Sequence, residues 1–236
     1  MNTSGIPLSS SLKPHQASLV IAGLVSLLLW VVPFLGFVLL PLQYLNTHLH
    51  EFCHAFMAIL SGGEVRYIHV FKGGDGVTLA SGSPFLVNPA GYIGAVVIGA
   101  LLIWFGRTER GAAIMMRGLA IVMVFSFIFW IRGDVVGVIS GIFWLLALLA
   151  LPSMLKGRHL VFAAQFLGMQ QCLTSVQALY ILFHISAFSG GHSDAQNMAQ
   201  FTGIPALFWA VLWGVLGLGT FLITLRASWT NRLPNQ

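Results

Sequence analysis

The chain has 236 residues, of which 57% are hydrophobic and only 7% are charged, and its formal net charge is +5. A soluble domain carries about a quarter charged residues, so this composition excludes an ordinary soluble protein and predicts an integral protein of the cell membrane. The eleven Lys and Arg residues are scattered. We therefore expect the lipid bilayer as a partner and no nucleic acid.

Seven apolar segments are long enough to be considered as membrane spans. They predict one all-α domain over residues 1–236, a polytopic bundle of six to seven transmembrane helices. The first segment is expected to be a retained accessory span and the others to form the functional core over 39–225. Cys53 and Cys172 lie inside apolar segments, so a disulfide is not expected. The segments are 17–37, 39–60, 89–105, 113–131, 135–154, 160–188 and 204–225.

Seven spans that alternate in direction would place loops 61–88, 132–134 and 189–203 on the side of the N-terminus. The same side would receive the polar end of segment 39–60. This arrangement puts four Lys and Arg residues on that side and six on the other, a difference too small to decide the orientation by the positive-inside rule.

The segment 62–87 interrupts the helical pattern. Apolar and polar residues alternate from Val65 to Lys72, the sequence GGDG at 73–76 is a turn signal, and VTLA at 77–80 can form a returning strand. We expect a short β-hairpin or reentrant element here, directly after segment 39–60. The alternative is an exposed loop.

Residues 50–54 read HEFCH, which matches the HExxH pattern. On a helix His50 and His54 are four residues apart and share one face, so both imidazoles can bind one Zn²⁺ ion. Glu51 borders that face and can act as general base toward a metal-bound water. His48 is turned about 200° from His50 and is expected to be structural. Cys53 is expected to be a packing residue.

Two other groups of residues accompany this pattern. The side chains of Gln170, Thr174, Gln177 and His184 form one polar stripe on segment 160–188, which predicts either a packing seam or the wall of a wet cavity. Small residues in the next span after the hairpin are expected to let it pack closely on the HExxH helix: Gly91, Gly94 and Gly99.

A catalytic zinc site needs a third protein ligand. The acidic residues on the side of the HExxH pattern are Glu64, Asp75, Asp134 and Asp194, whereas Glu109 falls on the other side. Asp134 can instead pair with Arg132, and Asp194 can instead cap a helix. His184 and His192 are further candidates.

The chain resembles the site-2 protease family of intramembrane zinc metalloproteases, in particular its smaller bacterial-type branch. The resemblance rests on HEFCHAFMAILSGG, NPAGYIGA and SDAQNMAQFTGIPALFW and covers residues from about 39 to 213. It implies that Asp194 completes the zinc site with His50 and His54. It also implies that Asn88 holds the substrate or the oxyanion. The Leu-Asp-Gly form around the third ligand is missing from this chain.

The expected function is therefore hydrolysis of peptide bonds in or near transmembrane segments of protein substrates, with Zn²⁺ as cofactor and Glu51 as base. The alternative is a non-proteolytic metal-binding membrane protein, either a metal transporter or sensor or a regulatory member of the family. A heptahelical receptor would explain the number of spans but none of the polar residues.

Overall fold

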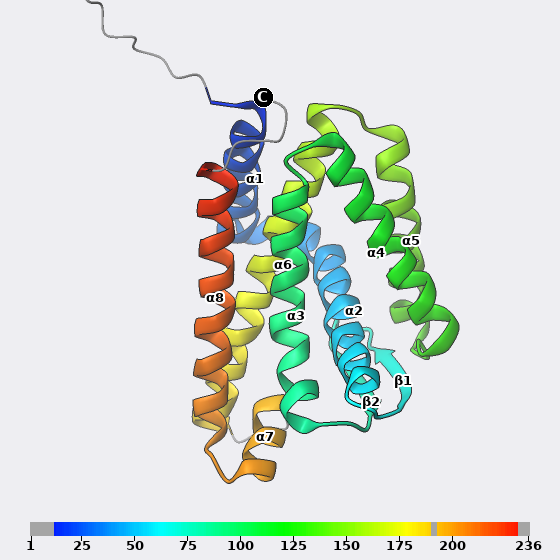
Figure 1. Cartoon of the computed structure of the whole chain (residues 1–236), viewed down its shortest axis with the longest axis vertical. Helices are drawn as coiled ribbons and strands as arrows, with labels where there is room; N and C mark the ends of the chain where they lie inside the picture. The colour runs from blue at the N-terminus through cyan, green and yellow to red at the C-terminus, as the bar shows by residue number, and fades with distance from the viewer. Residues whose placement is uncertain (1–11, 190–192, 231–236) are drawn as a thin grey trace, which may run out of the picture.

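The computed structural model describes residues 12–189 and 193–230, and most of them are helical. Figure 1 shows the long helices roughly along one axis, with α3 and α6 in the middle of the bundle. The predicted all-α bundle with a hairpin after the HExxH helix is confirmed. The elements in chain order are α1 (Pro14–Val31), a 3₁₀ turn (Pro33–Leu35), α2 (Gly36–Leu60), β1 (Val65–Val70), β2 (Gly76–Ala80), α3 (Pro84–Phe105), α4 (Glu109–Phe129), α5 (Val135–Met154), α6 (Arg158–His184), a π-helical turn (Ile185–Ser189), α7 (Asp194–Thr202) and α8 (Ala206–Thr230).

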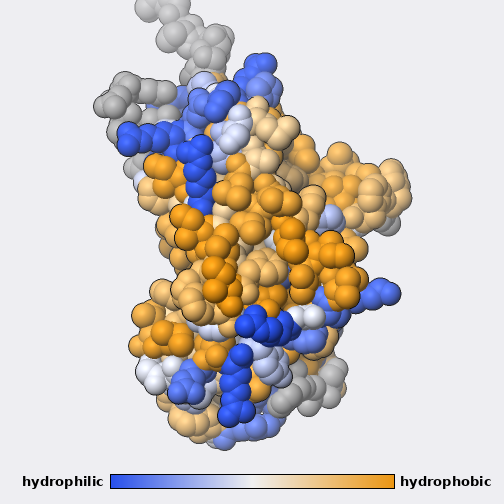
Figure 2. Space-filling view, turned by 90° about the vertical axis from the view of Figure 1, so that its right-hand side faces the viewer, coloured by the Kyte–Doolittle hydropathy of each residue, from blue (hydrophilic) through white to orange (hydrophobic). Residues whose placement is uncertain are grey.

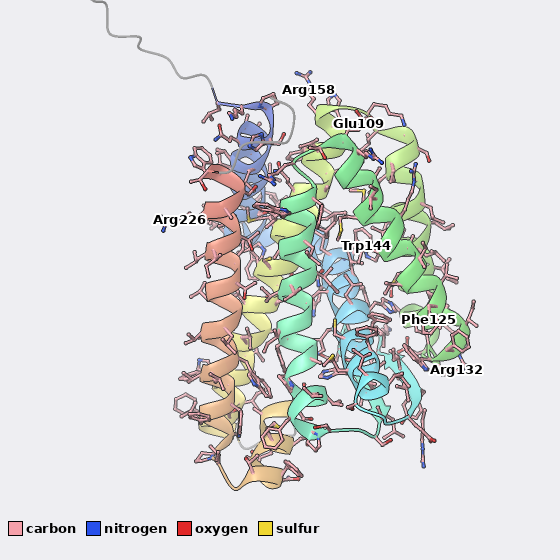
Figure 3. The ribbon with its side chains drawn as sticks, viewed as in Figure 1. Glu109, Phe125, Arg132, Trp144, Arg158 and Arg226 are labelled. Carbon is pink, nitrogen blue, oxygen red and sulfur yellow. The ribbon has the colours of Figure 1, made fainter. Side chains whose placement is uncertain are left out.

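Six helices of the described chain are long and apolar enough to cross a membrane: α1, α3, α4, α5, α6 and α8. Polar side chains in its second half keep α2 out of this group. Figure 2 shows an apolar belt between two more polar ends, and Figure 3 places Arg158 and Arg226 at one end and Arg132 at the other. The chain is an integral, multi-pass membrane protein.

The direction of α1 differs from the prediction. α1 begins beside the end of α8, where the Gln16 side chain donates a hydrogen bond to the Trp229 carbonyl. It ends beside the middle of α6, where Trp30 donates to the Gln170 side chain. After the turn that begins at Pro33, α2 continues toward the hairpin end instead of reversing (Figure 1). The described chain therefore begins at the end opposite the HExxH pattern, because the proline interrupts the helix without setting the direction of the next one.

Small residues let α3 approach two neighbouring helices. A Cβ added at Gly94 would lie 2.5 Å from the Cys53 sulfur on α2, whereas one added at Gly99 would lie 2.6 Å from the Cys172 sulfur on α6. Gly94 therefore packs on the HExxH helix as predicted, but Gly99 packs on α6. Both cysteines are buried and free.

The hairpin is held at the end of the bundle through β1. Its two strands are antiparallel, and Ile68 of β1 pairs with Thr78 of β2. On the outer edge of β1, Ile68 exchanges hydrogen bonds of 2.8 Å with Trp130 and Arg132. The sheet has two strands in the described chain, so the outer edge of β2 carries no further strand.

Asp134 ties the hairpin to α5. Its carboxylate accepts hydrogen bonds from the backbone amides of Gly137 (2.8 Å) and Lys72 (2.7 Å), so it caps α5. The predicted pairing with Arg132 is not formed, since that guanidinium donates to backbone carbonyls. Hydrogen bonds from Gly137 and then Lys72 lower the pKa of Asp134. Its contribution to stability is thus present at neutral pH and is lost as the pH falls through the lowered pKa.

Candidate metal centre

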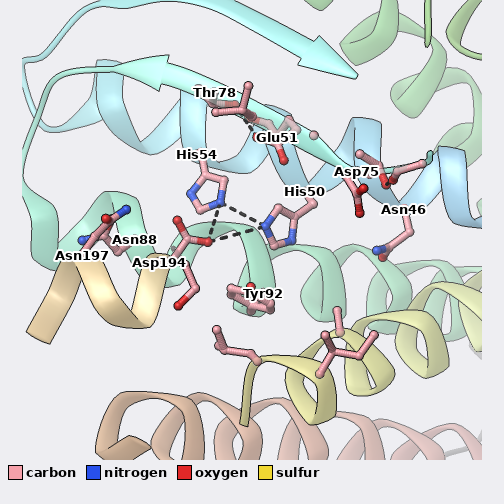
Figure 4. Close-up of a pocket in the computed structure, with 18 of the residues that line it drawn as sticks. Asn46, His50, Glu51, His54, Asp75, Thr78, Asn88, Tyr92, Asp194 and Asn197 are labelled. Carbon is pink, nitrogen blue, oxygen red and sulfur yellow. Dashed lines mark hydrogen bonds and ion pairs between the residues drawn. The ribbon is translucent and has the colours of Figure 1, made fainter. Parts of the chain in front are cut away.

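Core packing sets the rotation of α2 and thereby the direction of its polar residues. Leu42, Leu45 and Leu49 are buried in a cluster with residues of α4, α5 and α6. His50 and His54 lie about 125° away around the helix axis, by the 100° step between residues. They therefore face the cavity beside α3 and α7 (Figure 4).

Asp194 meets the two histidines from the first turn of α7. Its Oδ2 atom lies 3.4 Å from His54 Nε2 and 3.9 Å from His50 Nε2. The two Nε2 atoms are 3.0 Å apart. Ser193 caps α7, because its hydroxyl accepts from the Gln196 amide, and Asp194 is the residue after the cap. One metal ion could be held by this group, whose ligand atoms all lie within 4.8 Å of one another.

The start of α3 orients this group. The His54 ring bonds through Nδ1 to the Val87 carbonyl at 2.7 Å, which leaves Nε2 directed toward Asp194. A Cβ added at Gly91 would lie 2.3 Å from His50 Nε2 and 2.4 Å from His54 Nε2. Only glycine lets α3 pass so close to both imidazoles. The glycine of the sequence NPAG at 88–91 is thus required for the packing of α3 against the metal group.

The hairpin covers Glu51. The Thr78 hydroxyl donates to Glu51 Oε2 at 2.8 Å and also contacts the Glu51 carbonyl oxygen at 3.0 Å. A Cβ added at Gly76 would lie 2.6 Å from Glu51 Oε1. β2 therefore runs directly over this carboxylate, and a side chain at position 76 would displace one or the other.

A cavity of about 680 Å³ surrounds these residues. One wall is the β2 strand and the opposite walls come from α3, α6 and α7. Asn88 lines the cavity but belongs to the second turn of α3, because this helix begins five residues earlier than predicted, at Pro84. Tyr92, one turn further on, packs edge-to-face against His50 with ring centroids 4.7 Å apart.

The other residues singled out in the sequence lie elsewhere. His48 bonds to Gly137 and Ser140 of α5, in the structural position that was predicted. His184 bonds to the Tyr180 hydroxyl and is not in the metal group. His192 lies outside the described residues.

The polar stripe of α6 is divided between two environments. Thr174 and Gln177 line the cavity, as a wet wall requires. Gln170 instead bonds to Trp30 in the packing seam with α1. Each prediction is therefore correct for part of the stripe, whereas His184 fits neither, because it is exposed and bonds to Tyr180.

The comparison with protein families decides the class of this chain. The model of the family described as Peptidase M50B-like matches residues 20–224, which include every residue of the metal group. The chain belongs to the Peptidase M50B-like family. This is a site-2 protease family, so the resemblance seen in the sequence is confirmed, and the protein is a membrane metallopeptidase. No curated protein and no solved structure matches the chain.

This Peptidase M50B-like protein contains site residues that its sequence does not reveal. Thr78, Val87 and Tyr92 contact Glu51, His54 and His50, respectively, from β2 and α3. The alternation in the predicted hairpin indicated a strand but not which residue would reach Glu51. A backbone carbonyl, such as that of Val87, leaves no sequence signal at all.

Proposed function

We propose that this protein is an intramembrane zinc metalloprotease in which His50, His54 and Asp194 bind the metal and Glu51 is the general base. The observation that carries the proposal is the convergence of two imidazole Nε2 atoms and one carboxylate oxygen next to a further carboxylate. Two histidines and one acid, with an open fourth position, are a ligand set of catalytic zinc sites.

The distances within the group fit a zinc ion. Tetrahedral ligand bonds of about 2.0–2.1 Å separate neighbouring ligand atoms by about 3.3 Å. The three separations of 3.0, 3.4 and 3.9 Å lie around this value. The hydrogen bond from His54 Nδ1 to Val87 also supports the neutral tautomer that binds metal through Nε2.

Bound zinc would supply Lewis acidity toward the scissile carbonyl and would make water a stronger nucleophile at neutral pH. Glu51 would accept the proton of the attacking water and pass it to the leaving amine. Thr78 donates to Oε2 of this carboxylate. This contact would hold the Glu51 side chain in place and leave Oε1 to accept the proton of the water.

The proposed substrate is a transmembrane protein segment that unwinds at the site. A peptide bond inside a helix is already hydrogen-bonded, so it must be released before attack. The outer edge of β2 carries no strand in the described chain and runs along the cavity. An unwound segment can pair with this edge as an added strand. Asn88 would hold the main chain or the oxyanion of that segment.

The test is metal analysis of the purified protein together with cleavage of a model transmembrane substrate. We expect one tightly bound zinc per chain and cleavage that stops when zinc is removed and returns when zinc is added. The His50→Ala, His54→Ala double variant should bind no zinc at this site. Equal zinc in both proteins would contradict the metal site, whereas bound zinc without cleavage would favour a metal-binding role over proteolysis.

A further inference from the structure

One further polar residue faces the cavity from α7. Asn197 is three residues beyond Asp194, so the two side chains are about 60° apart on the same helix face. Both line the cavity. The neighbouring face of α7 is anchored by Ala195 and Met198, which are buried against α6 and α8. This anchoring fixes the rotation of α7 about its axis, so Asn197 is held on the cavity side together with Asp194.

Figure 4 draws Asn197 and Asn88 at the same end of the metal group, and both line the cavity. Contact between Phe85 and Phe201, with ring centroids 5.4 Å apart, holds α7 against the start of α3. Both asparagines are half-buried, and within the described residues neither carboxamide forms a hydrogen bond. Each offers two donor hydrogens and one acceptor oxygen toward the cavity.

These carboxamides could supply hydrogen-bond partners that an extended substrate would otherwise lack on one of its two edges. The N–H and C=O groups of an extended chain point to both of its edges, and pairing with β2 would satisfy only one edge. The other edge would face away from β2, toward α3 and α7. A main-chain group that loses its water on binding and gains no other partner costs free energy, so a partner on this second edge would favour binding.

We infer that Asn197, together with Asn88, forms a binding site for the main chain of the substrate on the edge opposite β2. This inference rests on the proposed proteolytic function. The ligand is an extended peptide main chain with a free amide N–H, whatever its side chain. Asn197 is thus a positioning residue: it recognises an unwound segment and not a particular sequence. A proline at the contacted substrate position would remove the N–H and weaken cleavage.

The test uses the full-length zinc protein and a model transmembrane peptide in which one amide at a time near the scissile bond is replaced by an ester. Each ester removes a single N–H. Asn197→Ala should lower kcat/KM about five- to tenfold, the effect of one hydrogen bond. At one ester position, kcat/KM should be no lower for Asn197→Ala acting on the ester than for either change made alone, because both changes remove the same hydrogen bond. Gln196→Ala, on the same helix but outside the cavity lining, is the matched control and should leave kcat/KM unchanged.

The outcomes separate this inference from the function on which it rests. Additive effects at every ester position, or unchanged kcat/KM in Asn197→Ala, would overturn the role of Asn197 while wild-type cleavage still stands. Failure of the wild-type protein to cleave any transmembrane peptide would overturn both. A loss of zinc in Asn197→Ala would show that the residue supports the metal group instead, and would also overturn the inference.

Discussion

At the scale of single residues, the proposed role of Glu51 as a base can be tested separately from metal binding. Glu51→Gln keeps the size of the side chain and can still accept the Thr78 hydrogen bond through its amide oxygen. It cannot take a proton from water. We expect zinc content to stay the same and kcat to fall by about 10²–10⁴-fold, the usual contribution of a general base. Zinc analysis and cleavage rates measured on the same samples check this; full activity would remove Glu51 from the mechanism.

Asp194 is tested by its effect on metal affinity. A partner outside the ligand shell typically changes affinity about 10–100-fold, so loss of a ligand should exceed that range. We therefore expect Asp194→Ala to weaken zinc binding by more than about 100-fold in a competition titration with a chelator. Asp75→Ala is the matched control, because Asp75 is another aspartate that lines the cavity but is not in the metal group. Equal affinities in the two variants would show that Asp194 is not a ligand.

At the scale of elements, the hairpin influences the site because β2 packs directly against the Glu51 side chain of α2. Gly76→Ala would place a Cβ 2.6 Å from Glu51 Oε1, so either β2 or the carboxylate must move. A displacement of about 1 Å can cost about 10²-fold in rate. We expect a ten- to hundredfold lower kcat with unchanged zinc, since the metal group does not touch Gly76.

Gly73→Ala is the hairpin control for this change. A Cβ there would meet only the Asp75 carboxylate, at 3.2 Å, and that side chain can rotate away. This variant should retain wild-type kcat. If both glycine variants lose activity equally, the general stability of the hairpin and not its contact with Glu51 would be the cause.

At the scale of the whole molecule, the path of α1 makes a prediction about topology. Both ends of the described chain lie at the end of the bundle opposite the hairpin. Single cysteines at positions 12 and 230 should therefore react with a membrane-impermeant thiol reagent from one side, and a cysteine at position 73 from the other. Cys53 and Cys172 are buried and should contribute little background. Labelling of positions 12 and 73 from the same side would contradict this topology.

The distribution of charge predicts which side is cytoplasmic. Because α1 begins at the end opposite the hairpin, Lys13 lies with the α3–α4 and α5–α6 connections and not on the hairpin side as predicted. Three described basic residues then remain at the hairpin end: Arg66, Lys72 and Arg132. Six described basic residues lie at the other end: Lys13, Arg107, Arg110, Lys156, Arg158 and Arg226. By the positive-inside rule, we expect the end with six to face the cytoplasm. In intact cells, position 73 should then be labelled and positions 12 and 230 should not.

Several features of this protein were predictable from local sequence alone. A 57% apolar composition arranged in long continuous segments determines a membrane bundle, because a helix satisfies its own backbone hydrogen bonds in lipid. The spacing of His50 and His54 determines that their side chains meet, because four residues are nearly one helical turn. Alternation followed by GGDG determined the hairpin, since both signals act over a few neighbouring residues.

Other features depended on contacts between segments far apart in the chain. The prediction placed the start of the chain on the wrong side, but it still grouped loops 61–88, 132–134 and 189–203 correctly, because that grouping depends only on the spans between them. The sequence could not show, however, which acidic residue of these loops would lie next to the two histidines. Only the packing of α7 brought Asp194 to His54, and only the fold of β2 brought Thr78 to Glu51. The physical reason is that helix periodicity and turn propensity act within one element, whereas a site is completed where several elements pack together.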